Sequence, residues 1–214
     1  MDVAVGATIN TLFKTGLRSI VAWCLLSAAG ILFARPIAAA LSPMMERVID
    51  AVQPTFAAHL SVVDSRDGPS VAMTCAAKRE IVFPQGRIVP LDGSFKCGSV
   101  DALHALVPMV IFLVAVTAWP IAGRREAVGR FVASLVLLPC VVALTTPVLL
   151  LGRVEAALDP STFRAESQLT ALLQPFVFME MGGRWLLPLI TAFLAIRVAA
   201  MLANTPAAAA ETAN

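Results

Sequence analysis

Cys97 and His104 are the side chains whose types and spacing could do chemistry in this sequence. They stand seven residues apart in the stretch FKCGSVDALHALVPM (residues 95–109), and His104 is one of only two histidines in the chain. A cysteine becomes a nucleophile when a base or a cation beside it lowers the pKa of its thiol. The alternatives are a disulfide and a free structural thiol. The structure predicted around Cys97 shows which of these three roles, nucleophile, disulfide or free thiol, fits best.

The composition is that of a membrane protein. Hydrophobic residues make up 58% of the 214 residues and charged residues 14%, and the mean hydropathy is +0.83. Soluble domains are about half apolar and a quarter charged, so part of this surface must face lipid. The net charge is only +2, without a long basic block. We therefore expect the lipid bilayer as a partner and no nucleic acid.

Charged residues divide the chain into four apolar runs, which predict transmembrane helices at 19–34, 102–123, 131–152 and 185–203. The first run is short for a hydrocarbon core of about 30 Å, but its flanking arginines can extend it by reaching the headgroups. The predicted fold is an α-helical polytopic membrane protein with about four transmembrane helices and a small β-rich extracytoplasmic loop domain.

Basic residues predict the orientation. The connection RREAVGR (124–130) carries three arginines against one glutamate, and positive charge in a short loop indicates the cytoplasmic side. Both termini, 1–18 and a disordered tail at 204–214, are then cytoplasmic, and the segments 35–101 and 153–184 lie outside. One alternative is that the first span is a cleaved signal peptide, which would leave three spans.

The first outer segment changes its pattern along its length. Ser42 and Pro43 suit the start of an amphipathic helix over 43–53, which lies either on the membrane surface or over the loop domain. Short β-prone runs separated by RDGP, PQG and DG then predict a meander of four or five strands over 58–97.

A disulfide between Cys75 and Cys97 is the preferred answer for the thiol. A domain of about 40 residues buries little core and usually needs a covalent staple. The two cysteines end the second and the last predicted strands, on the side where disulfides persist. Cys24 and Cys140 fall inside predicted spans, where cysteine behaves as a small apolar residue.

The nucleophile hypothesis rests on a polar cluster at the outer face. His104 lies about one turn inside the second span and Arg153 at the outer end of the third. The order CGS, apolar span, basic turn, span and Arg153 is similar to that of exosortases, membrane transpeptidases that use cysteine, arginine and histidine. No histidine follows Arg153 here, so the last catalytic group of that family has no matching position. We therefore expect no catalytic residue.

A closer resemblance is to the small membrane proteins that accompany exosortases, of the exosortase H-associated type. It covers residues 98–203 and rests on HALVPMVIFLVAV, the basic turn, a leucine-rich third span and RWLLPLI. The resemblance implies a non-catalytic accessory protein of protein sorting, export or envelope assembly in the bacterial inner membrane, with an exosortase as its membrane partner. It implies no cofactor.

Two further hypotheses concern metals and solutes. The two histidines stand 45 residues apart without a carboxylate cluster, so we expect no metal site. A small-solute transporter subunit is the other alternative, although the predicted spans hold few ionisable groups and show no repeat.

The second outer segment predicts a surface helix in which Phe163, Leu169, Leu172 and Leu173 share a face. Phe176, Phe178 and Met179 follow it and form a possible docking patch for a partner or lipid. The alternative is that this segment lies flat on the bilayer.

Overall fold

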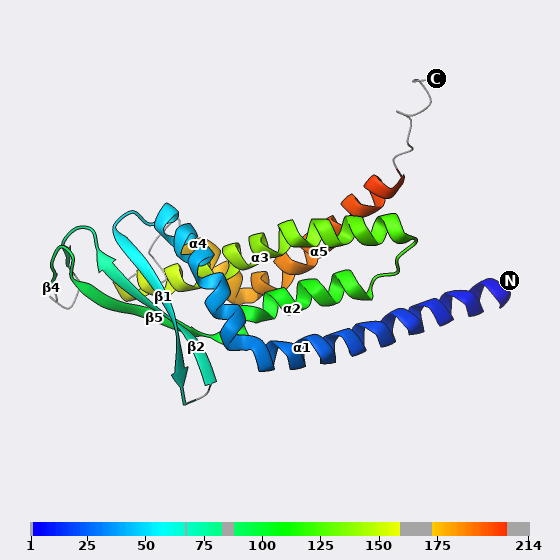
Figure 1. Cartoon of the computed structure of the whole chain (residues 1–214), viewed down its shortest axis with the longest axis horizontal. Coiled ribbons are helices and arrows are strands. Elements are labelled where there is room, and N and C mark those ends of the chain that lie inside the picture. The colour runs from blue at the N-terminus through cyan, green and yellow to red at the C-terminus, as the bar shows by residue number, and fades with distance from the viewer. Residues whose placement is uncertain (1, 67, 83–87, 159–172, 205–214) are drawn as a thin grey trace, which may run out of the picture. The chain divides into compact units, whose positions relative to one another are not determined.

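The computed structural model describes residues 2–66, 68–82, 88–158 and 173–204. In chain order the elements are α1 (Asp2–Val52), β1 (Phe56–Ser65), β2 (Gly68–Ala77), β3 (Ile81–Val82), β4 (Ile88–Val89), β5 (Ser94–Asp101), α2 (Ala102–Ala118), α3 (Arg124–Leu158), α4 (Leu173–Phe178), the π-helix η2 (Met179–Gly183) and α5 (Arg184–Asn204) (Figure 1).

The chain divides into two compact units. The helical unit comprises Met1–Ala29, Met109–Val141 and Leu186–Asn214, and the sheet unit comprises Gly30–Pro108 and Val142–Trp185. Helices α1, α2, α3 and α5 contribute residues to both.

Three helical segments of the described chain are long and apolar enough to cross a membrane, which is consistent with a polytopic membrane protein. They are Phe13–Val52, Arg124–Ala156 and Leu173–Ala203. The predicted second span is shorter than expected, because α2 has only 17 residues and ends at Ala118 instead of 123. Pro120 explains this end, since the residue before a proline disfavours the helical conformation. Four full-length spans are therefore not confirmed.

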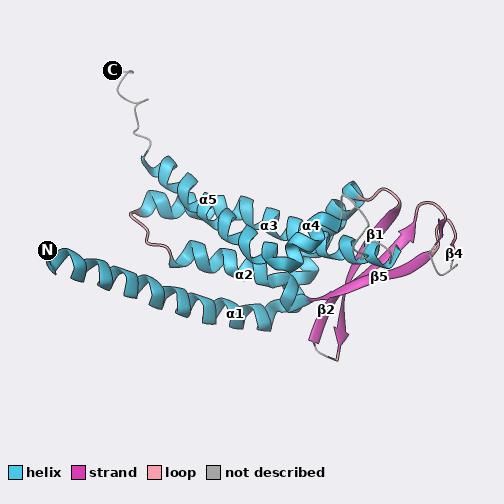
Figure 2. Ribbon diagram, turned by 180° about the vertical axis from the view of Figure 1, so that it is seen from behind, coloured by secondary structure: helices cyan, strands magenta, loops and turns pink. Residues whose placement is uncertain are grey.

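The connection between α2 and α3 differs from the predicted loop. Residues 124–130 form the first two turns of α3, and the connecting segment is 119–123 instead (Figure 2). The basic residues of the sequence RREAVGR therefore belong to a helix, which fixes where each of their side chains points.

Helix α1 is also longer than predicted. It runs from Asp2 to Val52 with a kink at Phe33 (φ −112°, ψ 15°), where two helical segments meet, so the predicted span 19–34 and surface helix 43–53 follow one another without a loop. Pro36 explains the kink, because proline lacks an N–H and its ring clashes with the carbonyl four residues earlier. Ser42 caps no helix start, since its hydroxyl donates to the carbonyl of Ala38 at 2.8 Å.

Small residues let the helices of the helical unit approach closely. Its buried core contains Phe112 and Val116 of α2, Val141 of α3, and Ala192 and Ala195 of α5. A Cβ at Gly129 would lie 3.3 Å from the Cβ of Ala199, so α3 and α5 nearly touch there. The outward faces stay apolar, as a lipid environment requires. They carry exposed Phe131, Leu135, Ile190, Phe193 and Leu194.

The sheet unit is built on three antiparallel strands in the order β1-β2-β5, with β3 and β4 forming a separate two-stranded hairpin. Alternate residues of each strand point into the core, as the period-2 pattern predicts. The buried face includes Phe56, Leu60, Val71, Met73 and Cys75, and α1 supplies Met45 and Ile49.

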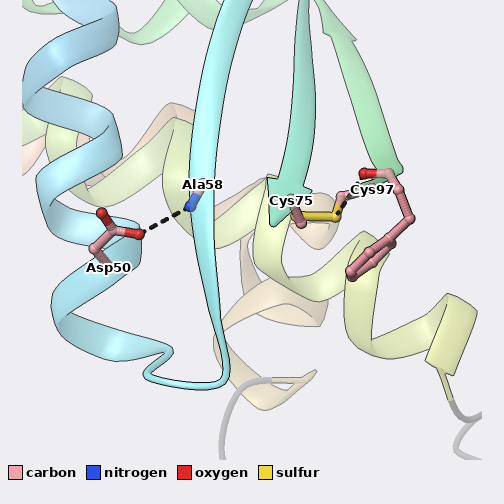
Figure 3. Close-up of a disulfide and its surroundings, with 5 residues drawn as sticks. Asp50, Ala58, Cys75 and Cys97 are labelled. Atoms are coloured by element: carbon pink, nitrogen blue, oxygen red, sulfur yellow. Dashed lines mark hydrogen bonds between the residues drawn. A yellow bond between two sulfur atoms is a disulfide. The ribbon is translucent and has the colours of Figure 1, made fainter. Parts of the chain in front are cut away.

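The free edge of β1 is occupied by carboxylates of α1. Asp50 Oδ1 accepts a hydrogen bond from the backbone N–H of Ala58 at 2.9 Å (Figure 3), and Glu46 Oε1 accepts one from Leu60 at 2.6 Å. Residues four apart on a helix rise about 6 Å, and residues two apart on a strand rise about 6.7 Å. The two spacings match, so α1 pairs with the edge where another strand would otherwise lie. The segment 43–53, as the last part of α1, therefore packs against the sheet.

Replacing Asp50 with alanine tests this edge pairing. We expect the variant to lose about 1–3 kcal/mol of stability in the sheet unit, because the N–H of Ala58 loses its acceptor. Hydrogen–deuterium exchange of residues 56–65 in detergent should accelerate, and less so in Asp50→Asn, which keeps a carbonyl acceptor.

The matched control is Asp64→Ala. It removes the exposed Arg35–Asp64 ion pair of 3.1 Å, which we expect to contribute less than about 1 kcal/mol. Unchanged exchange at Ala58 in Asp50→Ala would show that the helix does not hold this edge.

Candidate functional site

Cys75 and Cys97 form a disulfide between adjacent strands, with their Cα atoms 6.1 Å apart (Figure 3). In the ladder Cys75 lies opposite Phe95, and the pairing slips by one residue between Met73 and Thr74. Cys97 is the extra residue, so a β-bulge lies at the disulfide. Both sulfur-bearing side chains are buried in the core.

The disulfide changes what Cys97 can do. A cysteine in a disulfide has no thiol to ionise, so the nucleophile hypothesis has no support in this structure. Closing a loop of 22 residues stabilises a small domain by about 3 kcal/mol in the chain-entropy model. Cys24 and Cys140 are free and exposed on α1 and α3.

His104 and Arg153 are both exposed, and their hydrogen bonds differ in kind. The backbone N–H groups of Leu103 and His104 donate to Oδ1 of Asp101, at 2.7 and 3.2 Å, so Asp101 caps α2. The guanidinium of Arg153 donates from Nη1 to the carbonyl of Ser99.

Gly98 suits its position by its backbone conformation, beside Arg153. Its φ of +156° is a conformation that favours glycine, and a Cβ there would lie 3.9 Å from the Cβ of Arg153. The two residues of the predicted polar cluster, His104 and Arg153, are therefore placed differently. Arg153 reaches the backbone two residues from Cys97, while no contact found among the described residues joins His104 to Arg153.

The three predicted docking residues differ in exposure. The ring of Phe176 packs on Gly152 so closely that a Cβ there would lie 2.1 Å from it. Met179 is buried, and Phe178 is 49% exposed. The predicted surface helix, with Phe163, Leu169 and Leu172, lies outside the described residues. Phe178 is therefore the docking candidate that the structure leaves open, beside the exposed Met181.

The outer face of the sheet has a hollow that sequence reasoning missed. Its volume is about 600 Å³, and its lining mixes polar residues (Ser61, Ser65, Ser70, Thr74, Lys96 and Ser99) with Val63, Ala72, Met73, Cys97 and Gly98. Alternate polar residues in the strands were the available signal, because every second residue shares a face.

A second feature missed in the sequence is a buried ion pair at the start of α3. Arg130 is 3% exposed and pairs with Glu126, one helical turn earlier. Glu126 also accepts a hydrogen bond from the backbone N–H of Ala122 at 2.8 Å. The spacing Glu-x-x-x-Arg was the signal.

Arg130 completes the end of α2. Its guanidinium donates to the carbonyls of Val116 at 3.4 Å, Trp119 at 2.8 Å and Pro120. The last carbonyls of a helix have no partner within it. Arg130 therefore acts as a side-chain cap and ties α2 to α3.

Arg130→Ala should be strongly destabilising, because it leaves the buried Glu126 carboxylate without its cation. We expect a lower midpoint of thermal unfolding in detergent, followed by tryptophan fluorescence, because the Glu126 carboxylate and the last carbonyls of α2 lose their partner. The double variant Glu126→Ala/Arg130→Ala should lose less than Arg130→Ala alone.

Arg124→Ala is the control, since Arg124 is an exposed arginine of the same helix. It should shift stability by no more than about 0.5 kcal/mol. Equal losses in Arg124→Ala and Arg130→Ala would contradict the assigned role of the buried pair.

Metal ligands do not gather in the part of the chain that the structure describes, where no three His, Cys, Asp or Glu side chains come together. Comparison of the whole sequence and structure with family models, characterised proteins and solved structures finds no match. The resemblance to exosortase-associated proteins therefore stays a prediction.

Proposed function

We propose that this chain is a non-catalytic integral membrane accessory protein that works by contact with a membrane enzyme of the exosortase kind, in protein sorting, export or envelope assembly. The observation that carries the proposal is the Cys75–Cys97 disulfide. Cys97 in this disulfide has no thiol, which the enzymatic alternative requires. The disulfide also stabilises a small domain whose surface can contact a partner.

The charged side chains around the sheet support the same proposal. Glu46 and Asp50 hold the edge of β1, and Arg153 holds the carbonyl of Ser99. Each of these groups is engaged with backbone of its own unit, which is the use expected of structural residues. A contact function needs a rigid surface more than a reactive group.

The finer location is also part of the proposal. We propose the bacterial inner membrane, with both termini cytoplasmic and the sheet unit outside. A disulfide persists in an oxidising compartment, and the exposed Arg124 and Arg125 follow the positive-inside rule if the start of α3 is cytoplasmic.

Reporter fusions test the orientation. A reporter fused at Ser65, in the tip between β1 and β2, should be active only if it is of the periplasmic type. A reporter fused at Ile121, in the 119–123 connection, should be active only if it is of the cytoplasmic type. A periplasmic reporter active at Ile121 would reverse the orientation.

Substitutions at the outer face test the contact mechanism. His104→Ala should leave recovery of an exosortase-type enzyme in mild detergent, and its processing activity, within about twofold of the unaltered chain, because the side chain supplies no catalysis. Arg153→Lys should do the same, since it keeps a donor for the carbonyl of Ser99. Phe178→Glu and Met181→Glu should weaken recovery, since a desolvated carboxylate is costly at an apolar contact.

The matched control is Leu91→Glu, which places the same charge at another exposed apolar position of the sheet unit. Loss of activity in both His104→Ala and Cys97→Ser, with Cys75→Ser active and all three at normal abundance, would show that the chain is a thiol enzyme. Failure to recover any exosortase-type enzyme would reject the proposed partner.

A further inference from the structure

The helical unit has a basic hollow where α3 begins and α5 ends. Its volume is about 430 Å³, and its lining consists of Ala122, Gly123, Arg124, Arg125, Glu126, Ala200 and Ala203. A second hollow, of about 620 Å³, shares Arg124, Arg125 and Ala203 with the first and adds Val128 and Leu202. The two hollows adjoin at these shared residues, and we refer to them together as the depression, with its basic part at the arginines and its apolar wall at Val128 and Leu202.

The basic part carries uncompensated positive charge. Glu126 is the one acidic residue in the lining, and its carboxylate is already engaged by Arg130 and by the N–H of Ala122. Arg124 and Arg125 are exposed, and neither takes part in the ion pairs found among the described residues. The first turn of α3 adds the partial positive charge of a helix N-terminus.

The depression lies at one end of two helices that are long and apolar enough to cross a membrane. Arg124 is the first residue of one candidate span and Ala203 the last of another. We expect basic residues at the end of a membrane-spanning helix at the depth of the lipid headgroups. Val128, one turn further along α3, and Leu202 of α5 are both more than half exposed, so the apolar wall begins where acyl chains begin.

We propose that this depression binds the phosphate headgroup of an anionic phospholipid, with Arg124 and Arg125 on the phosphate and Val128 and Leu202 beside the first part of an acyl chain. Guanidinium groups recognise phosphate oxygens through paired hydrogen bonds, and basic pockets between membrane helices are suited to anionic headgroups. A free phosphate ion would use the same arginines but has no need of the apolar wall. This lipid site does not depend on the proposed partner.

Native mass spectrometry of the detergent-purified full chain tests the proposal. The chain is titrated with phosphatidylglycerol, with zwitterionic phosphatidylcholine and with inorganic phosphate. We expect the unaltered chain to retain phosphatidylglycerol in preference to phosphatidylcholine. Arg124→Gln/Arg125→Gln should weaken this binding by about tenfold or more. Arg124→Lys/Arg125→Lys should weaken it less, because the charge remains.

Lys78→Gln/Arg79→Gln is the matched control, since it neutralises two adjacent exposed basic residues in the sheet unit. It should leave phosphatidylglycerol binding unchanged. Equal retention of the two lipids, or equal losses in the two Gln pairs, would overturn the site. Full displacement of the lipid by millimolar inorganic phosphate, with Val128→Ser/Leu202→Ser binding normally, would show a soluble anion site and overturn the lipid assignment.

Discussion

A backbone amide or carbonyl that loses its partner in an apolar setting costs about 1–3 kcal/mol, and the ends and edges of elements are where partners are missing. This chain has few charged residues, and several of them are placed at these points. Glu46 and Asp50 serve the edge of β1, Asp101 the start of α2, Arg130 its end, and Arg153 the carbonyl of Ser99. Satisfying the backbone is thus the constraint on which both units depend.

The need to satisfy backbone groups also gives different roles to arginines that stand close together in the sequence. The run RREAVGR carries three of them, but helix periodicity turns Arg130 inward, onto Glu126 and the end of α2, while Arg124 and Arg125 stay exposed. A positive charge that is buried beside its counter-ion contributes little to the electrostatic potential outside the protein. The two exposed arginines therefore carry the charge that the bilayer, or an anion in it, meets.

The sequence predicts those features that depend on local pattern. Short β-prone runs between turn sequences predict the strands of the 58–97 segment, and two cysteines at the ends of predicted strands predict their pairing. The order β1-β2-β5 with a separate β3-β4 pair is not the sequential meander that these runs predicted. Features set by packing were not predictable. Pro36 interrupts α1 with the kink at Phe33, yet helix continues through Pro43 to the residues that contact β1. The ring of Phe176 packs on Gly152, where a side chain would leave no room for it. Nothing near Phe176 in the sequence indicates this contact.

Helix α3 shows how the structural contacts restrict the functional hypotheses. Near its start Arg130 fixes the end of α2 within the helical unit, and further along Arg153 fixes β5 within the sheet unit. An arginine that must hold a backbone carbonyl is a poor electrophilic catalyst, because its donors point at that carbonyl instead of a substrate. The disulfide imposes the same restriction on Cys97. The side chains of Arg130, Arg153 and Cys97 are thus used to position strands and helix ends. The surfaces that these contacts keep rigid are what a contact function requires.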